Sequence, residues 1–139
     1  MGVFVFQSVP GRYDLRREIQ PGRRDTWYAT RYRSEMKPGD PVFFWMGGDE
    51  SHRGLYGWGL IASEPYLKSG WDSHGVDVTY EVSFPEPVLA KSLSADPTLG
   101  RMLIFRAPQA TNFLLSDAEA RRLVEFVGAR NLPAPAIRA

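Results

Sequence analysis

The chain has 139 residues, a length that fits one domain and leaves little room for two. Hydrophobic residues make up 43% of it and charged residues 24%, as in a soluble globular domain with a genuine core. The lack of cysteine excludes disulfides and thiolate metal sites, and no apolar run approaches the roughly 18 residues that a membrane span needs. The N-terminus lacks the basic region of a signal peptide, so we expect a cytoplasmic protein.

The first third of the chain predicts a strand, a short helix and a loop. Residues 2–8 are rich in Val and Phe, which is typical of a strand buried on both faces, and Pro10-Gly11 ends it. Residues 13–20 predict a short helix that Pro21-Gly22 stops. Residues 23–34 have no clean periodicity and predict a loop.

The middle of the chain predicts two neighbouring strands. The turn signal at residues 37–40, Lys-Pro-Gly-Asp, precedes a strand over residues 41–46. Residues 54–62 predict the next strand, in which Gly57 and Gly59 share one face. Two glycines on one face indicate close approach by backbone, by a ring or by a ligand, and close packing within a small barrel is the simplest of these.

A loop and a third strand follow. Residues 64–75 predict the loop. Residues 77–84 alternate between apolar and polar side chains, which predicts a half-buried strand. Pro85 and Pro87 are expected to break that strand, with a further short strand over residues 88–91.

The last part of the chain predicts helices. Residues 92–100 favour a short helix, whereas the apolar residues 102–105 fit a helix or a strand. Residues 116–130 predict the most secure helix, because Ser116 and Glu119 form a capping box before an apolar stripe at helical spacing.

These elements predict an α+β fold: a small, mostly antiparallel β-barrel with two to three peripheral helices. The chain lacks the alternating strand and helix pattern of a doubly wound sheet. We expect a single domain over residues 1–130 and a poorly ordered tail over residues 131–139, where the composition turns to Pro and Ala.

Four side chains near strand ends are candidates for holding a flat ligand. Trp27 follows a basic, polar stretch, Trp45 ends a predicted strand, and Asn112 and Phe113 lie in a polar turn. Two rings about 7 Å apart can sandwich a nucleobase, with roughly 1–3 kcal/mol per stacked base, and an amide can read its edge. Residues 11–37 hold eight basic and four acidic side chains, a local charge of +4 that fits either a phosphate backbone or a solvated surface.

The order of these segments resembles the EVE domain, a member of the PUA-like superfamily and a relative of the YTH domain. The resemblance covers roughly residues 2–128, and the joint order of the motifs is more specific than any one of them. The matching segments are Val3–Phe6, Thr26-Trp27, Met36–Trp45, Gly54–Ile61, Tyr80–Val82, Gln109–Phe113 and Leu115–Glu119.

The resemblance implies a PUA-like barrel that takes up one flipped, methylated or hydroxymethylated base in an aromatic cage. By position it assigns base binding to Trp27, Trp45, Asn112, Phe113 and Ser8, and phosphate binding to Arg23, Arg24, Arg31 and Arg33. It implies a non-catalytic reader whose partner is nucleic acid, modified DNA ahead of RNA, without a cofactor, a metal or a membrane partner. An effector protein encoded elsewhere is a further expected partner.

Two other functions stay open on the sequence. A small nucleotide-processing enzyme on the same barrel would use His52 with Asp49 or Glu50, although neither histidine has metal-ligand spacing and no catalytic motif is present. A protein-interaction module would instead recruit a partner through Trp71 or Tyr66.

Overall fold

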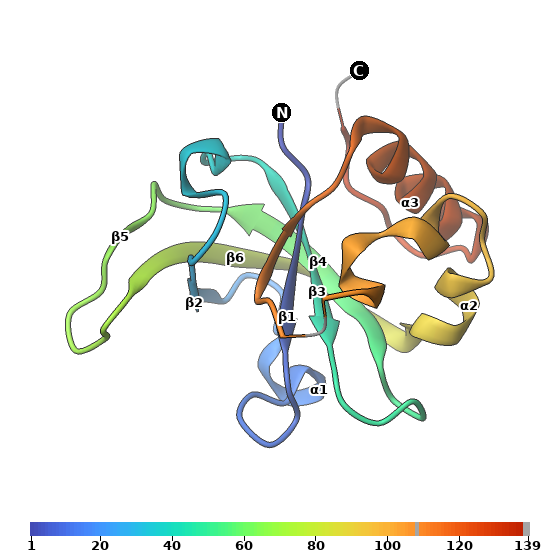
Figure 1. The fold of residues 1–139 in the computed structure, drawn as a ribbon, viewed down its shortest axis with the longest axis horizontal. Helices are drawn as coiled ribbons and strands as arrows, with labels where there is room; N and C mark the ends of the chain where they lie inside the picture. The colour runs from blue at the N-terminus through green and yellow to red at the C-terminus, as the bar shows by residue number, and fades with distance from the viewer. Residues whose placement is uncertain (108, 138–139) are drawn as a thin grey trace.

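The structure, a computed structural model, describes residues 1–107 and 109–137. Its strands and helices are shown in Figure 1. The strands are β1 (Phe4–Ser8), β2 (Arg24–Tyr28), β3 (Pro41–Met46), β4 (Gly54–Ile61), β5 (Tyr66–Leu67), β6 (His74–Leu89) and β7 (Asn112–Leu114). The α-helices are α1 (Leu15–Glu18), α2 (Ala90–Ser94) and α3 (Asp117–Ala129), and the 3-10 helices are η1 (Arg33–Glu35), η2 (Leu99–Arg101) and η3 (Leu103–Phe105).

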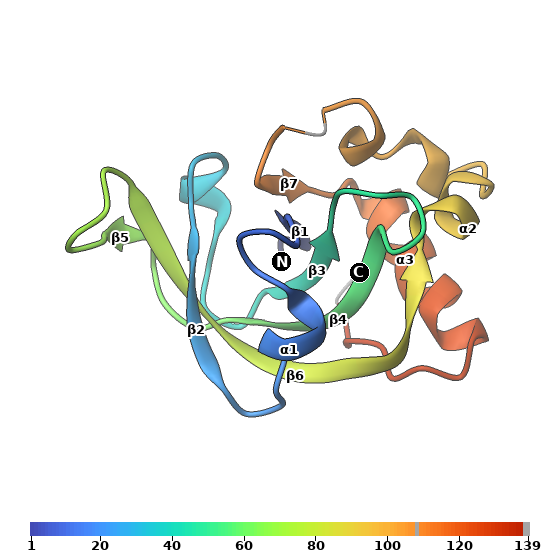
Figure 2. The ribbon, with the colours of Figure 1, turned by 90° about the horizontal axis from the view of Figure 1, so that it is seen from below.

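The strands form one sheet in the order β2-β6-β4-β3-β1-β7, with β5 added beside β6. β1 pairs with β3 in parallel, and the other neighbours are antiparallel. The long strand β6 bends strongly, so that the sheet curls, while α2 and α3 lie at one end of the molecule and β2 and β5 at the other (Figures 1 and 2). The predicted α+β fold with a mostly antiparallel, barrel-like sheet is confirmed.

The two outermost strands of the curled sheet are joined by one side chain. Asn112 of β7 is fully buried, and its carboxamide oxygen accepts a hydrogen bond from the Thr30 backbone N–H at 2.9 Å. Its carboxamide nitrogen donates to the Tyr28 carbonyl at 2.9 Å. Because β2 and β7 stand at opposite ends of the strand order, these bonds draw the sheet toward a closed barrel.

The sheet separates two hydrophobic cores. Successive side chains of a strand point to opposite faces, so Phe44 of β3 enters one core and Trp45 the other. The first, here called the Trp27 core, packs Trp27 with the β1 phenylalanines and with Leu15 of α1. The second, the Trp45 core, is covered by helices, among them α3 through Leu123 and Val127.

The glycines of β4 allow close packing between strands. A Cβ atom at Gly57 would lie 2.1 Å from the Val82 carbonyl oxygen, and one at Gly59 would lie 2.2 Å from the Thr79 carbonyl oxygen. Both contacts are to the backbone of β6, at places where the β4–β6 register shifts. The close approach that the sequence indicates is therefore made by neighbouring backbone, as in the simplest of the three alternatives.

Two predictions that concern β2 and β6 are wrong. Residues 24–28, expected in a loop, form β2 against β6. Pro85 and Pro87 do not end β6, because they lie in a bulge where five steps along β6, from Ser83 to Val88, face only two steps of β4. Within that bulge the missing proline N–H groups cost no ladder hydrogen bonds.

The C-terminal segment packs against the domain as far as it is described. Residues 131–137 contain no helix or strand, yet Leu132, Ala134 and Ile137 lie against the Trp45 core. The Trp58 indole N–H also donates to the Pro133 carbonyl at 3.0 Å. The poor order that composition predicts for residues 131–139 stays a prediction, and residues 138–139 lie outside the described residues. Across the described chain, the helices are too short or too polar to cross a lipid bilayer.

Candidate base-binding site

Trp27 lies in β2 and points into the Trp27 core. Alternation along the strand places Asp25 and Trp27 on the inner face and Tyr28 on the outer face. The indole is 6% exposed, and its ring packs 5.3 Å from Phe44 and 5.6 Å from Tyr13, centroid to centroid. The Tyr13 ring meets it nearly at right angles, at 88°. Trp27 is therefore a core residue whose outer contact is a tyrosine from outside the sheet.

Hydrogen bonds join Trp27 to a carboxylate at the rim of the sheet. The Trp27 indole N–H donates to the Tyr80 hydroxyl at 3.0 Å, and that hydroxyl donates to Asp25 Oδ2 at 2.7 Å. The Tyr13 hydroxyl donates to the same oxygen. Burial and the bond to Asp25 raise the pKa of Tyr80, so its hydroxyl stays protonated and remains a donor. These four residues, Tyr13, Asp25, Trp27 and Tyr80, are called the Trp27 cluster below.

Arg23 offsets the charge of the cluster's carboxylate. Its guanidinium lies 3.7 Å from Asp25 Oδ2 and 5.8 Å from the centre of the Tyr80 ring. It also pairs with the Glu18 carboxylate at 2.9 Å and donates to the Glu18 carbonyl at 2.7 Å. Arg23, predicted to hold a phosphate, thus already has partners within the fold.

Ser8 adds an unused polar group on the face of the sheet that carries the Trp27 core. It ends β1, where alternation places it on the same face as Phe6, whose ring lies 6.0 Å from that of Trp27. Its hydroxyl oxygen is buried and has no hydrogen-bond partner among the described residues. A buried hydroxyl of this kind can still accept or donate one bond to a ligand.

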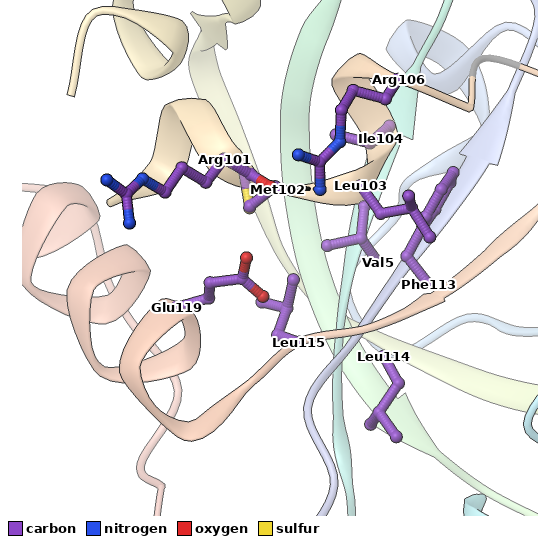
Figure 3. A pocket seen from close by; sticks show the side chains of 10 residues that line it. All are labelled: Val5, Arg101, Met102, Leu103, Ile104, Arg106, Phe113, Leu114, Leu115 and Glu119. Carbon is purple, nitrogen blue, oxygen red and sulfur yellow. Dashed lines mark hydrogen bonds between the residues drawn. The ribbon is translucent and has the colours of Figure 1, made fainter. Parts of the chain in front are cut away.

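The prediction that Trp27 and Trp45 form two walls of one slot is wrong. Trp45 is 1% exposed and belongs to the Trp45 core, where it packs edge-to-face on Phe105 at 5.6 Å. Phe113 lies on that side too, and with Val5 it lines a cavity of about 220 Å³ (Figure 3). The physical reason is the two-residue period of strands, which turns Trp45 away from Phe44 and hence from Trp27.

Asn112 lies on the same face as Trp27, but its amide is engaged. It pairs across β1 with Phe6, so it shares that face. Its hydrogen bonds to the Tyr28 carbonyl and the Thr30 N–H use both ends of the carboxamide. A role for Asn112 in reading a base stays a prediction.

The remaining arginines divide between two surfaces. Arg24 points to the outer face of β2 and pairs with Asp77 at 3.0 Å. Arg31 and Arg33 make no ion pair with any described residue, and they line an open groove of about 400 Å³ together with Tyr32. The Arg31 guanidinium lies 5.3 Å from the centre of the Tyr32 ring. A role for this pair in contacting phosphates stays a prediction.

The family model described as EVE domain matches residues 3–126. The chain belongs to the EVE domain family. No curated protein sequence matches it.

Several solved structures are similar to this EVE domain in fold. Agrobacterium tumefaciens protein Atu2648 is 20% identical with a TM-score of 0.73, and the match covers 98% of this chain and 100% of that one. Human THYN1, solved in complex with DNA containing 5-methylcytosine, is 17% identical with a TM-score of 0.67, covering 97% and 100%. The YTH domain of Zygosaccharomyces rouxii MRB1, solved with N6-methyladenosine RNA, is 14% identical with a TM-score of 0.53, covering 99% and 89%.

Three residues of the Trp27 cluster, Tyr13, Asp25 and Tyr80, are not among the site residues predicted from the sequence. Asp25 and Trp27 stand two apart, which would have indicated a shared face had β2 been predicted as a strand. Tyr80 lies in the half-buried strand expected over residues 77–84, where alternation alone indicates no particular partner. Tyr13 carries no sequence signal for its contact with Trp27, because the segment before α1 meets β2 only in the folded chain.

The residues of the enzymatic alternative do not form a catalytic arrangement in the described part of the EVE domain. Asp49 accepts a hydrogen bond from the Ser51 backbone N–H at 2.8 Å, which lowers the pKa of its carboxyl. The His52 ring makes no hydrogen bond with Asp49 or Glu50, and its Nε2 atom is buried without a partner among the described residues. A histidine oriented by a carboxylate would need such a contact, so the described residues do not form the His52–carboxylate pair of this alternative.

Proposed function

We propose that this EVE domain is a non-catalytic module that binds nucleic acid by taking up a modified base beside Trp27. The base in this proposal is methylated or hydroxymethylated, and DNA is favoured over RNA. Membership of the EVE family supports it, as do the similar folds of a human protein solved with 5-methylcytosine DNA and of a YTH domain solved with methylated RNA. A separately encoded effector protein remains a prediction from the sequence.

The observation that carries the proposal is the Trp27 cluster. It combines a large aromatic ring, held in place by Phe44 and Tyr80, with a carboxylate that accepts hydrogen bonds at the rim. A flat base needs both a ring to contact and polar groups to read its edge. Because β2 and β6 hold Trp27, Asp25 and Tyr80 before a ligand arrives, these three side chains need little further ordering on binding.

Charge and polar groups nearby fit the same ligand. Arg31 and Arg33 follow Trp27 by four and six positions and have no ion-pair partners among the described residues. They would contact the flanking phosphates, so binding should weaken as salt rises. Ser8, with its buried hydroxyl, would add a hydrogen bond to the base.

The direct test is a binding titration with labelled oligonucleotides of one sequence, carrying cytosine, 5-methylcytosine or 5-hydroxymethylcytosine at the centre. We expect the modified oligonucleotides to bind several-fold more tightly, since one methyl group in an apolar niche contributes about 0.8 kcal/mol. Trp27→Leu removes the ring but keeps an apolar core residue. It should weaken binding by roughly 10- to 100-fold, the value of one stacked base.

Tyr28→Leu is the matched control, because Tyr28 is the next residue of the same strand and points to the outer face, 48% exposed. It should bind like the unmodified protein. Circular dichroism establishes that both variants fold. Equal affinity for all three oligonucleotides, or equal losses in the two variants, would contradict the proposal.

A further inference from the structure

The cavity of about 220 Å³ lies between the sheet and the helical end of the molecule (Figure 3). One side of it is formed by β1 and β7, where Val5 pairs with Phe113, and Leu115 follows on the same face as Phe113. Met102, between η2 and η3, and Ile104 of η3 line the cavity as well. All five side chains are buried, so the inner surface of the cavity is apolar.

An apolar cavity of this size accommodates a single aromatic ring. Cavities of roughly 150 Å³ lined by Leu, Ile and Phe take up benzene, so about 220 Å³ leaves room for a ring with one small substituent. The Phe113 ring makes no aromatic pair with another described residue, and the Met102 thioether is a group that contacts aromatic rings favourably. The lining therefore favours a small aromatic ligand.

Three charged side chains, Arg101, Arg106 and Glu119, lie around the same space, on the side away from Val5 and Phe113 (Figure 3). Both arginines are exposed, so they mark the side on which the cavity meets solvent. Together the three side chains carry a formal charge of +1, because two guanidinium groups face one carboxylate. One singly charged anion would balance it.

The two guanidinium groups have donors left for such an anion. Neither arginine forms an ion pair with a described residue. Arg106 donates to the Arg101 carbonyl at 3.1 Å, which uses one of its five N–H groups. The Glu119 carboxylate is instead engaged at the start of α3, where it accepts from the Ser116 N–H at 2.9 Å.

We infer that this cavity is a second ligand site, which binds a small aromatic carboxylate with its ring against Phe113 and its carboxylate on Arg101 and Arg106. A guanidinium presents parallel N–H donors that match the two oxygens of a carboxylate. Glu119 disfavours a ligand with two negative charges. The cavity and the Trp27 cluster lie on opposite faces of the sheet, so the inference does not depend on the proposed function.

The test is a titration of the full chain with benzoate, followed through the backbone amide chemical shifts. We expect saturable shifts that are largest at Val5, Met102, Phe113 and Leu115. Benzyl alcohol keeps the ring without the charge, and acetate keeps the carboxylate without the ring. Each should bind at least about tenfold more weakly than benzoate, since the first loses charge-assisted hydrogen bonds and the second loses the buried ring.

A double variant tests the arginines. Arg101→Met with Arg106→Met removes both guanidinium groups but keeps long apolar side chains, so benzoate should bind about tenfold or more weakly while benzyl alcohol binds as before. The matched control is Arg12→Met with Arg121→Met, which removes the same charge from two exposed positions outside the cavity. The control should bind benzoate like the unmodified protein. Thermal unfolding establishes that both double variants fold.

Three results would overturn the inference. Benzoate would then give no saturable shift up to about 10 mM, or its shifts would fall outside the cavity, or benzyl alcohol would bind as tightly as benzoate. Equal losses in the two double variants would also overturn it, because general attraction to a basic protein would explain them. Should the cavity variant fail to fold, the comparison of the three probes on the unmodified protein still decides.

Discussion

The two faces of β3 show how one strand can supply aromatic rings to a structural core and to a candidate binding site. Phe44 packs on Trp27, whose indole N–H is hydrogen-bonded to Tyr80 and through it to a carboxylate at the rim. Trp45, the next residue, packs on Phe105, and its indole N–H has no partner among the described residues. Both tryptophans are buried, so burial does not distinguish them. The two tryptophans differ in their hydrogen bonding, because Trp27 is joined through Tyr80 to a carboxylate at the rim of the sheet.

The largest expected effect is on the stability of the Trp45 core. Trp45→Ala should lower the free energy of unfolding by about 3–5 kcal/mol, because it leaves a large cavity beside Phe105. Urea unfolding measures this loss. Below the unfolding transition, the folded variant should bind modified oligonucleotides normally.

Trp45→Phe is the control for that prediction. It keeps a ring near Phe105 and removes an unpartnered buried N–H, so it should cost much less than the alanine variant. A specific loss of binding in a folded Trp45 variant would mean that the two faces are not functionally separate.

The next effect concerns the side chain that joins the edges of the sheet. Asn112→Ala leaves the Tyr28 carbonyl and the Thr30 N–H without their partner, and should lower the free energy of unfolding by about 2–3 kcal/mol. Hydrogen exchange at the Thr30 amide should speed up more than exchange within β4. Unchanged exchange at Thr30 would contradict the role of Asn112 in closing the barrel.

The smallest effect is at the start of α3, on the side of the Trp45 core. Ser116 accepts a hydrogen bond from the Glu119 N–H at 3.1 Å, and the Glu119 carboxylate accepts one from the Ser116 N–H at 2.9 Å. Ser116→Ala should cost about 1 kcal/mol in thermal or urea unfolding, and Ser116→Gly only a few tenths. Neither should alter binding, and an equal loss in both variants would argue against the capping contribution.

Elements with strong local signals were predicted well. The strand over residues 41–46 and the capping box of α3 are confirmed, because a turn signal, a run of apolar residues and a cap act within a few positions of the chain. β2 was missed because Arg-Asp-Thr-Trp-Tyr has no strong local pattern, and its strand depends on pairing with β6 about 50 residues away.

The candidate site was predicted only in part. Trp27 was expected to lie near a second aromatic ring, that of Trp45. The rings that contact it are instead those of Tyr13 and Phe44. The error follows from judging Trp45 by its position at a strand end without fixing which face it occupies. A shift of one residue along a strand reverses that face.

The sequence alone determined the order of most elements, the ends of the best-capped ones and the resemblance to the EVE family, because these depend on neighbouring residues. The tertiary structure decided that Tyr13, Asp25 and Tyr80 meet at Trp27, since a contact such as Trp27 to Tyr80 joins residues 53 positions apart. Such contacts depend on the curl of the whole sheet, and no local pattern specifies them.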